Sequence, residues 1–315
     1  MLAICPNPTI DRLVVLQQLR PGTVLRAREN RSYPAGKSVS AARGSRANGA
    51  RPGVLALLPE DGAGWYLETL RAEGMDVAVH LCPGVVRESI IVLEDDGRVT
   101  VLNGTGAQVA AEVWDEFVAA AVDGIRPGAW VVCSGSFPPG VEPAAVAQLV
   151  AAVAGAGGQL ALDTGPAWLP AALSGEALPA LVAPNLAEAE AVLAGGDPVE
   201  HTWVGEGALE RAAAAAAGLR ARGIESVVVT AGAAGLAWHS GDATGVLAGQ
   251  DVAVRNPIGA GDAFLGGLVA RLEQGLAFAD ATVWGMATAC AAIEQWSPGG
   301  AEPARVEHHH AAILG

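Results

Sequence analysis

Short apolar runs of the kind that form buried strands alternate with helix-forming stretches along most of this chain. The predicted strands cover residues 1–5, 53–58, 129–135, 159–164, 180–185 and 226–232. Ala-rich amphipathic stretches separate them, and these predicted helices cover residues 39–48, 64–73, 110–123, 143–156, 186–194 and 207–222. Such alternation indicates a mainly parallel sheet with helices on both faces. We therefore predict an α/β fold, with an almost entirely helical pattern from Gly259 onward.

Two stretches break this alternation. Residues of about 12–34 and 86–104 show the period of two that is typical of half-buried strands, and the second contains a "DDG" turn of hairpin type. They predict a small antiparallel sheet that projects from the main one as a lid, a dimer surface, or both. Because no internal repeat or disordered linker is evident, we predict a single domain over residues 1–315.

Charge and cysteine usage limit the possible partners. With 19 basic and 33 acidic residues the net charge is −14, which argues against nucleic-acid binding and against attachment to an anionic membrane. The four widely spaced cysteines form no metal-binding pattern and are typical of a reducing compartment. The first residues, "MLAICPNPTIDR", do not resemble a signal peptide, and no apolar run is long enough to span a bilayer. We expect a cytoplasmic protein that acts on a small molecule.

Five polar loops come directly after predicted strands. They are "NPTID" (7–11), "SGSFPPG" (134–140), "DTG" (163–165), "PNLAE" (184–188) and "TAGAAG" (230–235). Ligands of open α/β sheets bind at the carboxyl ends of the strands, so these loops predict one shared site.

The stretch "NPIGAGDAF" (256–264) places an aspartate after a turn of small residues and before a buried helix pattern. Two interpretations are open. Asp262 can cap a structural helix, which is the better interpretation of the motif alone. Alternatively, the small residues let backbone amides approach a phosphate at a helix N-terminus, with Asp262 as a catalytic base.

"NPIGAGDAF" resembles the C-terminal signature of the PfkB, or ribokinase-like, family of carbohydrate kinases, and the order of elements resembles that family over the whole chain. The resemblance implies a ribokinase-like three-layer fold with a small β-sheet lid. It also implies an anion hole made by Gly259, Ala260 and Gly261, with Asp262 as the base. Asn256, at the start of the motif, is assigned to the nucleotide site.

The closer similarity is to the 1-phosphofructokinase, tagatose-6-phosphate kinase and phosphofructokinase-2 subgroup. By this resemblance Asp11 binds sugar hydroxyls and Ser136 contacts the substrate. Arg87, in "VVRES", lies where the subgroup binds the phosphate already on the sugar. A guanidinium suits a phosphate because it offers two parallel donors. Considered alone, Arg87 is better explained as a solvated charge on a strand.

Two further elements imply ATP and Mg²⁺ as cofactors. In "PNLAE", the resemblance implies that Asn185 and Glu188 organise Mg²⁺ and the nucleotide phosphates, with Glu188 as the metal ligand. The same spacing is nearly a capping box, and both roles can hold together. The loop "TAGAAG" resembles the nucleotide-binding loop, which assigns Thr230, Gly232 and Gly235 to ATP. No G-x-x-x-x-G-K-[ST] element occurs, which argues against a P-loop kinase.

The chain departs from the family pattern at ligand-facing positions. "AGKSVS" (35–40) keeps Gly36 and Lys37, which we assign to substrate binding. Ser38 replaces a usual glycine, and Ser40 replaces the usual sugar-binding asparagine. Ala183 replaces a usual lysine, and in "RES" a serine stands where asparagine is common. A serine at position 40 can still bind substrate, but its single hydroxyl lacks the two-sided pattern of an amide, which alters sugar preference.

These features predict an ATP-dependent kinase that phosphorylates a hydroxyl of a sugar phosphate, such as fructose 1- or 6-phosphate or tagatose 6-phosphate. A homodimer formed through the lid is expected, because lid strands have exposed edges. Two alternatives stay open. One is a kinase of an unphosphorylated sugar, nucleoside or other small alcohol. The other is a catalytically weak regulatory protein that binds a metabolite. The histidines of "EHHHAAILG" (307–315) are interpreted as part of a solvated tail.

Overall fold

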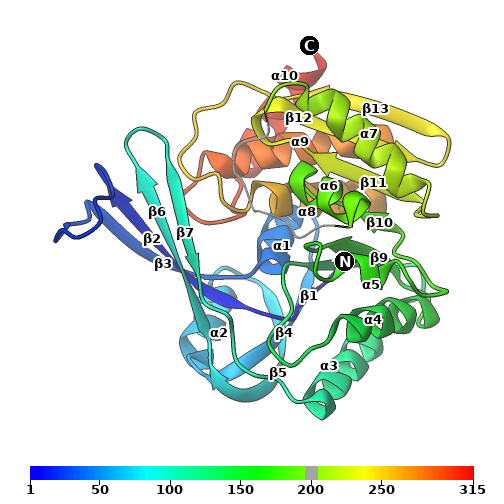
Figure 1. Ribbon diagram of the computed structural model, residues 1–315, viewed down its shortest axis with the longest axis horizontal. Coiled ribbons are helices and arrows are strands. Elements are labelled where there is room, and N and C mark those ends of the chain that lie inside the picture. Colours follow the sequence, from blue (N-terminus) through cyan, green and yellow to red (C-terminus); the bar gives the residue numbers. More distant parts are fainter. Residues whose placement is uncertain (196–204) are drawn as a thin grey trace.

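The computed structural model describes residues 1–195 and 205–315, and within these ranges nine strands form one large sheet (Figure 1). In spatial order the strands are β13 (Ala243–Ala248), β12 (Gly235–Ser240), β11 (Ser226–Thr230), β10 (Leu181–Val182), β9 (Gln159–Asp163), β8 (Trp130–Ser134), β1 (Leu2–Cys5), β4 (Gly53–Asp61) and β5 (Asp76–Val85). In this spatial order, the seven strands from β11 to β5 are parallel to one another, and β12 and β13 run antiparallel to their neighbours. The predicted mainly parallel sheet is confirmed.

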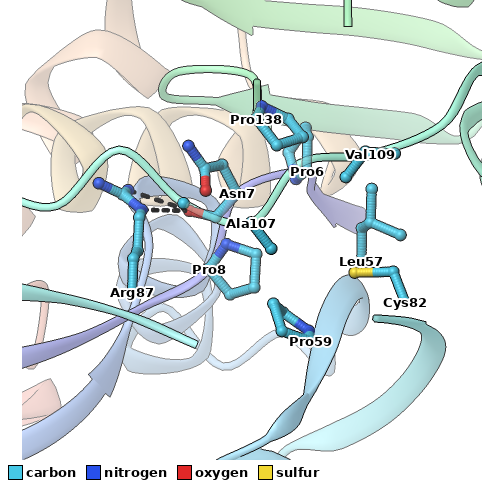
Figure 2. Close-up of a pocket in the computed structure, with 11 residues that line it drawn as sticks. Pro6, Asn7, Pro8, Leu57, Pro59, Cys82, Arg87, Ala107, Val109 and Pro138 are labelled. Carbon is cyan, nitrogen blue, oxygen red and sulfur yellow. Dashed lines mark hydrogen bonds between the residues drawn. The ribbon is translucent and has the colours of Figure 1, made fainter. Parts of the chain in front are cut away.

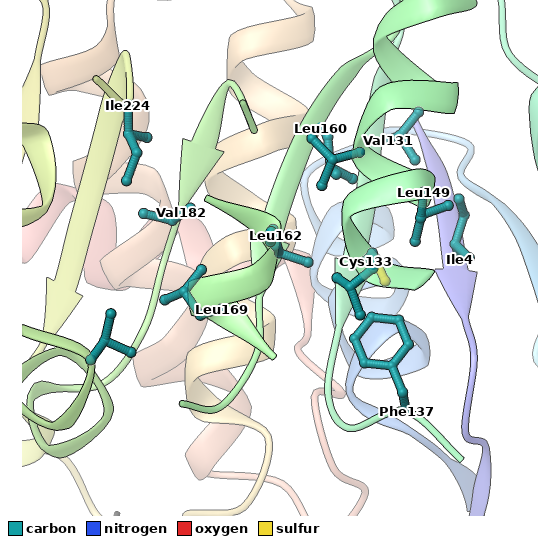
Figure 3. Close-up of a cluster of buried hydrophobic side chains, with 14 of the residues drawn as sticks. Ile4, Val131, Cys133, Phe137, Leu149, Leu160, Leu162, Leu169, Val182 and Ile224 are labelled. Carbon is teal, nitrogen blue, oxygen red and sulfur yellow. The ribbon is translucent and has the colours of Figure 1, made fainter. Parts of the chain in front are cut away.

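Successive side chains of a strand point to opposite faces of the sheet. Helices cover both faces, so both sets of side chains are buried. Figure 3 shows Val131, Cys133, Leu160 and Leu162 in the core on one face. The helices on that face are α3 (Ala111–Asp123), α4 (Pro143–Gly155), α5 (Leu169–Ala172), α6 (Leu186–Ala194) and α7 (Ala208–Arg220). The intervening residues face the helices α1 (Lys37–Ala47), α2 (Ala63–Ala72), α8 (Ala260–Glu273) and α9 (Phe278–Ile293). The three-layer α/β fold is therefore as predicted.

Three strands were not predicted from the sequence, and all lie at the edges of the large sheet. β5 forms one edge, and the β12–β13 hairpin forms the other. The outermost strands, β5 and β13, are partly exposed, so their sequences lack a continuous apolar run. The alternating exposure along β13 shows this directly.

The C-terminal segment corrects one interpretation, because the histidines lie on a packed helix rather than a solvated tail. Helix α10 (Pro303–Leu314) packs against α9, with Val306 and His309 buried. The imidazole of His310 stacks on the indole of Trp284, with ring centroids 3.7 Å apart. The helical period gives the three adjacent histidines different environments, so only one face of the segment is solvated. No helix in residues 1–195 and 205–315 is long and apolar enough to cross a membrane.

A second sheet of four strands projects from the large one, at the left of Figure 1. Its order is β3 (Glu29–Ala35), β2 (Thr9–Leu16), β6 (Arg87–Glu94) and β7 (Val99–Asn103). The separate small sheet is confirmed, but its central pair, β2 and β6, is parallel, so the antiparallel prediction was wrong there. The reason is the direction of the preceding strands. β2 follows β1 and β6 follows β5, and both leave the large sheet at the carboxyl ends of its parallel strands.

Helices α1 and α8 cross at very short distance because glycines face backbone at the crossing. A Cβ on Gly266 would overlap the carbonyl oxygen of Ala41, and one on Gly44 would overlap that of Ala263. This close packing brings the two helices together at the carboxyl edge of the sheet, with Lys37 and Asp262 in their first turns.

Candidate active site

Side-chain and backbone contacts join all five loops that follow the predicted strands. The Asn7 side chain donates to the Ser136 hydroxyl at 3.2 Å. The Ser134 hydroxyl lies 2.8 Å from Asp163 Oδ2. Lys37 links Asp163 to Glu188, and Asn185 forms a β-bridge with Thr230. The predicted convergence at the carboxyl edge is therefore present in the structure.

The N-terminus of α8 is open. Gly259 occupies the N-cap position with φ of +84°, where a side chain is strained, and a Cβ there would lie 2.7 Å from the amide nitrogen of Gly299. No side chain caps the helix, and within the described residues no backbone carbonyl accepts from the amides of Gly261 and Asp262. Unpaired amides at a helix N-terminus attract anions, so this turn can bind a phosphate.

Asp262 is buried in the first turn of this open helix. Its Oδ1 lies 2.9 Å from the Ser134 hydroxyl. Burial raises the pKa of the Asp262 carboxyl to about 7, and the negative charge of Asp163 adds to the increase, whereas Lys37 and the Ser134 hydrogen bond oppose it. A carboxyl with a pKa near neutrality is suited to act as a general base.

Lys37 begins helix α1 and supplies the positive charge among these carboxylates. Its Nζ lies 3.4 Å from Asp163 Oδ2 and 4.0 Å from Glu188 Oε1. These neighbours, Asp163 first, hold the pKa of Lys37 above its usual value, so the ammonium stays charged. The side chain is still 43% exposed, so it is accessible to an anionic ligand.

Asn185 and Glu188 form a complete capping box at the start of α6. The Asn185 side chain accepts from the Glu188 amide at 2.9 Å, and Glu188 Oε2 accepts from the Asn185 amide at 2.9 Å. The structural role that the spacing indicates is therefore present, and Glu188 is buried. A ligand role requires the carboxylate to serve both the cap and the ligand.

Asp11 and Arg87 lie close together on the neighbouring strands β2 and β6. Burial raises the pKa of Asp11 to about 6, and the nearby Arg87 and Arg43 guanidinium groups partly offset this increase. Figure 2 shows the Arg87 guanidinium turned towards Asn7, whose carbonyl oxygen it contacts at 3.0 and 3.2 Å. A third donor reaches the carbonyl of Gly104 at 3.1 Å. Arginine has five N–H donors, so two stay available for a ligand.

The cavities do not mark this cluster. The pocket drawn in Figure 2, between Asn7 and Cys82, has a volume of about 10 Å³, enough for one water molecule. A second pocket of about 470 Å³ lies between Tyr33, Arg43 and Pro303, and neither Asp262 nor Lys37 lines it.

Gly36 and the residues that depart from the family pattern have local structural roles. Gly36 has φ of +129°, and a Cβ there would lie 2.6 Å from Cys5 Sγ. The Ser38 hydroxyl bridges two strands, because it lies 2.5 Å from the Ile4 carbonyl and accepts from the Ser134 amide at 2.8 Å. Ser40 is buried and donates to the Pro298 carbonyl at 3.4 Å. Ala183 packs in the core below α8.

Three further residues are assigned to the nucleotide, and two of them have local structural roles. Asn256 is buried, donates to the Trp296 carbonyl at 2.9 Å and accepts from the Ile258 amide at 3.0 Å, so it shapes the loop before α8. Gly235 starts β12, where a Cβ would overlap the Leu247 carbonyl. Gly232 is exposed at the end of β11, near the Thr230 that bridges to Asn185.

Sequence reasoning missed Asp163, Ser134 and Asn7 as site residues. All three lie in or beside loops that were recognised as site-forming. Asp163 ends a predicted strand, and this position was the available signal, because carboxyl-end residues of adjacent parallel strands meet. Nothing local in the sequence indicates that Ser134 contacts both Asp163 and Asp262.

The three-layer fold with a separate small sheet is that of the ribokinase-like class. The family model "pfkB family carbohydrate kinase" matches residues 7–305, and the chain belongs to this family. The predictions of this family and of an ATP-dependent carbohydrate kinase are confirmed.

Relatives of known name cover nearly the whole chain. The 1-phosphofructokinase of Haemophilus influenzae is 30% identical over 304 residues, which are 95% of this chain and 92% of the relative. That of Xanthomonas campestris pv. campestris is 32% identical over 276 residues, 86% and 83% of the two chains.

Solved structures show the same fold at lower identity. The phosphofructokinase-2 from Escherichia coli in complex with fructose-6-phosphate has a TM-score of 0.86 at 21% identity, and the match covers 100% of this chain and 99% of that one. The ribokinase from Thermotoga maritima has a TM-score of 0.71 at 15% identity, covering 99% and 98%.

Proposed function

We propose that this enzyme transfers the γ-phosphoryl group of ATP to a hydroxyl of a hexose phosphate, with fructose 1-phosphate as the first candidate. The observation that carries the proposal is the buried Asp262 in the first turn of an uncapped helix. The relatives named 1-phosphofructokinase support the choice of sugar phosphate.

In the proposed mechanism Asp262 removes the proton of the acceptor hydroxyl, whose oxygen then attacks the γ-phosphorus in line. The charge that develops on the transferring group is stabilised by the backbone amides of the turn at Gly259–Gly261, continued by that of Asp262, and by the positive end of the α8 dipole. Such amides are already oriented before the reaction, so they stabilise the transition state without reorganising.

Lys37 and Arg87 supply positive charge for phosphate groups in a chain of net charge −14. Arg87 retains two donors after its bonds to the Asn7 and Gly104 carbonyls, which suits a phosphate on the sugar. Asp11 and the exposed hydroxyl of Ser136 are assigned to sugar hydroxyls, with Gly36 allowing close approach of the chain.

Glu188 is the residue proposed to hold Mg²⁺. The residues fit a sparse site, because Mg²⁺ is commonly held by one or two carboxylates, the substrate phosphates and several waters. Bound Mg²⁺ would supply charge neutralisation on the nucleotide phosphates. Asn185, Thr230, Gly232, Gly235 and Asn256 are proposed to form or support the nucleotide site.

The test is an ADP-release assay with Mg²⁺-ATP against sugars, sugar phosphates and nucleosides, with Asp262→Asn beside the wild type. Turnover with phosphorylated hexoses that disappears in the variant is the expected result. Turnover that persists in Asp262→Asn would refute the role of the base. No ADP release with any compound of the panel would favour a regulatory protein that binds a metabolite.

An acceptor without a phosphate is the second candidate function. The observation that favours it is the engagement of Arg87 by two backbone carbonyls. Arg87→Ala separates the two: a sugar phosphate predicts at least a tenfold rise in KM for the acceptor, and a neutral acceptor predicts little change. Arg12→Ala is the matched control, because Arg12 lies on the same small sheet in an exposed pair with Glu88.

We also propose that the small sheet serves as a lid and as the surface of a homodimer. The chain is proposed to be one domain, since β2 and β6 continue directly from the large sheet. Ile90 and Leu102 are 36% and 57% exposed and lie opposite each other on β6 and β7. The variant Ile90→Asp is expected to shift the mass measured by light scattering to that of a monomer.

The four free, buried cysteines support a cytoplasmic location.

A further inference from the structure

The hydroxyl of Ser134 lies between two carboxylates. It is buried at the end of β8, 2.8 Å from Asp163 Oδ2 and 2.9 Å from Asp262 Oδ1. A serine hydroxyl has one proton and can donate to only one of them at a time. When the hydroxyl donates to Asp262 Oδ1, its lone pairs face Asp163.

The surrounding charges make the two carboxylates different. Lys37 Nζ lies 3.4 Å from the same Asp163 oxygen that contacts Ser134, so the charge of Asp163 is compensated. Asp262 faces Lys37 from α1, Asp163 from the end of β9 and Asp11 from β2. Cys5 on β1 is close as well, but burial raises the pKa of its thiol to about 12, so it is neutral. Asp262 is thus the carboxyl that gains and loses a proton.

We propose that Ser134 is a positioning residue that orients the proposed base. Its hydroxyl donates to Oδ1 of the Asp262 carboxylate and leaves Oδ2 for the acceptor hydroxyl. When the acceptor O–H bond breaks and its proton moves to Oδ2, Oδ1 becomes the carbonyl oxygen of the new carboxylic acid and still accepts from Ser134. Oδ1 of Asp262 is therefore held in both states, and the hydrogen bond is stronger to the charged carboxylate. This inference rests on the proposed role of Asp262 as base.

Two substitutions are expected to shift the pKa of the Asp262 carboxyl in opposite directions. Ser134→Ala removes a hydrogen bond that stabilises the charged carboxylate, so the rise of kcat/KM with pH moves upward, by about one pH unit. Asp163→Asn removes a neighbouring negative charge, so the rise moves to lower pH. Ser134→Thr keeps the hydroxyl and restores the wild-type position of the rise.

The experiment is the pH profile of kcat/KM for the acceptor in the wild type and these three variants. Ser38→Ala is the matched control, since Ser38 is equally buried and bonds to the backbone of Ser134 but to neither carboxylate. Its profile is expected to coincide with that of the wild type. Coincident profiles for the wild type, Ser134→Ala and Ser38→Ala would overturn the inference.

Failure of the proposed function has a different signature. If Asp262→Asn keeps its activity, or the wild type shows no rise with pH, the base assignment fails whatever Ser134 does. If Ser134→Ala is too slow to assay, the pKa of the Asp262 carboxyl is followed by ¹³C NMR in the folded protein. A higher pKa in Ser134→Ala supports the inference, and an unchanged one overturns it.

Discussion

Helices α6 and α8 both begin at the carboxyl edge of the large sheet, but their N-termini are built in opposite ways. Asn185 and Glu188 close the start of α6 with two reciprocal hydrogen bonds of 2.9 Å. α8 starts at Gly259, and no side chain caps it. Capping occupies amides that could otherwise bind an anion, so the amides at the start of α6 are engaged, whereas the open start of α8 is in accord with the proposed phosphate site.

The open terminus costs stability. A missing cap costs about 1 kcal/mol, and the buried Asp262 adds the cost of ionising in a desolvated site. Residues that bind a charged ligand are commonly less stable than their surroundings, and substitutions there trade function for stability. The comparison therefore predicts opposite consequences for substitutions at the two helix starts.

The largest effect is expected for Asp262→Asn. Loss of a general base lowers kcat by about 10²–10⁴-fold. The same variant is expected to be more stable than the wild type at pH 8. The pKa of Asp262 is about 7 in the fold and 3.8 in the reference state, so the folded wild type binds the extra proton between these values. Its stability therefore falls as the pH rises through that range, and the fall is absent in the variant.

Calorimetric melting of both proteins at pH 5 and pH 8, with kcat from ADP release, measures the two effects. Equal pH dependence of Tm in the wild type and Asp262→Asn would contradict a raised pKa. Unchanged kcat would contradict the base.

Gly259→Ala is expected to lower both activity and stability. The residue has a positive φ, and its new Cβ would lie 2.7 Å from the Gly299 amide nitrogen. We expect at least a tenfold loss in kcat and a loss of about 1–2 kcal/mol in the free energy of unfolding. Gly261→Ala is the control for stability, because a Cβ on the exposed Gly261 would meet nothing within 4 Å. Equal unfolding free energies for the two variants in urea would contradict the strain argument.

Glu188→Gln removes charge at the capped helix and keeps an oxygen that can accept from the Asn185 amide. We expect little change in Tm, because the capping box geometry can persist. The Mg²⁺ concentration for half-maximal activity is expected to rise about tenfold, since side chains that hold or orient the ligands of a metal commonly contribute this much to its affinity. A titration of activity with MgCl₂ at fixed ATP measures it. A Mg²⁺ dependence equal to that of the wild type would remove Glu188 from the metal site.

Asn185→Ala is expected to have the smallest effect. It deletes the side chain that accepts from the Glu188 amide, and loss of an N-cap costs about 1 kcal/mol. Urea unfolding with an unchanged m-value would show that loss. Asn185→Ser, which can cap, is expected to recover most of it. A stability equal to the wild type would show that water caps α6 as well as Asn185 does.

Local patterns in the sequence determined most of the fold and part of the site. Helix and strand periodicity defines the parallel sheet, because apolar spacing reflects burial on one or both faces. The open turn at Gly259–Asp262 and the capping box at Asn185–Glu188 are both read from residues within four positions, since small residues and capping side chains act on their own backbone.

Contacts between distant residues were decided only by the tertiary structure. The parallel pairing of β2 with β6 depends on where β1 and β5 lie in the large sheet. The contacts of Ser134 with Asp163 and Asp262 join residues that are 29 and 128 positions apart. Sequence patterns encode which residue types a segment needs, but the partner of a buried hydroxyl is set by packing, here by the close crossing of α1 and α8 that brings Asp262 to the end of β8.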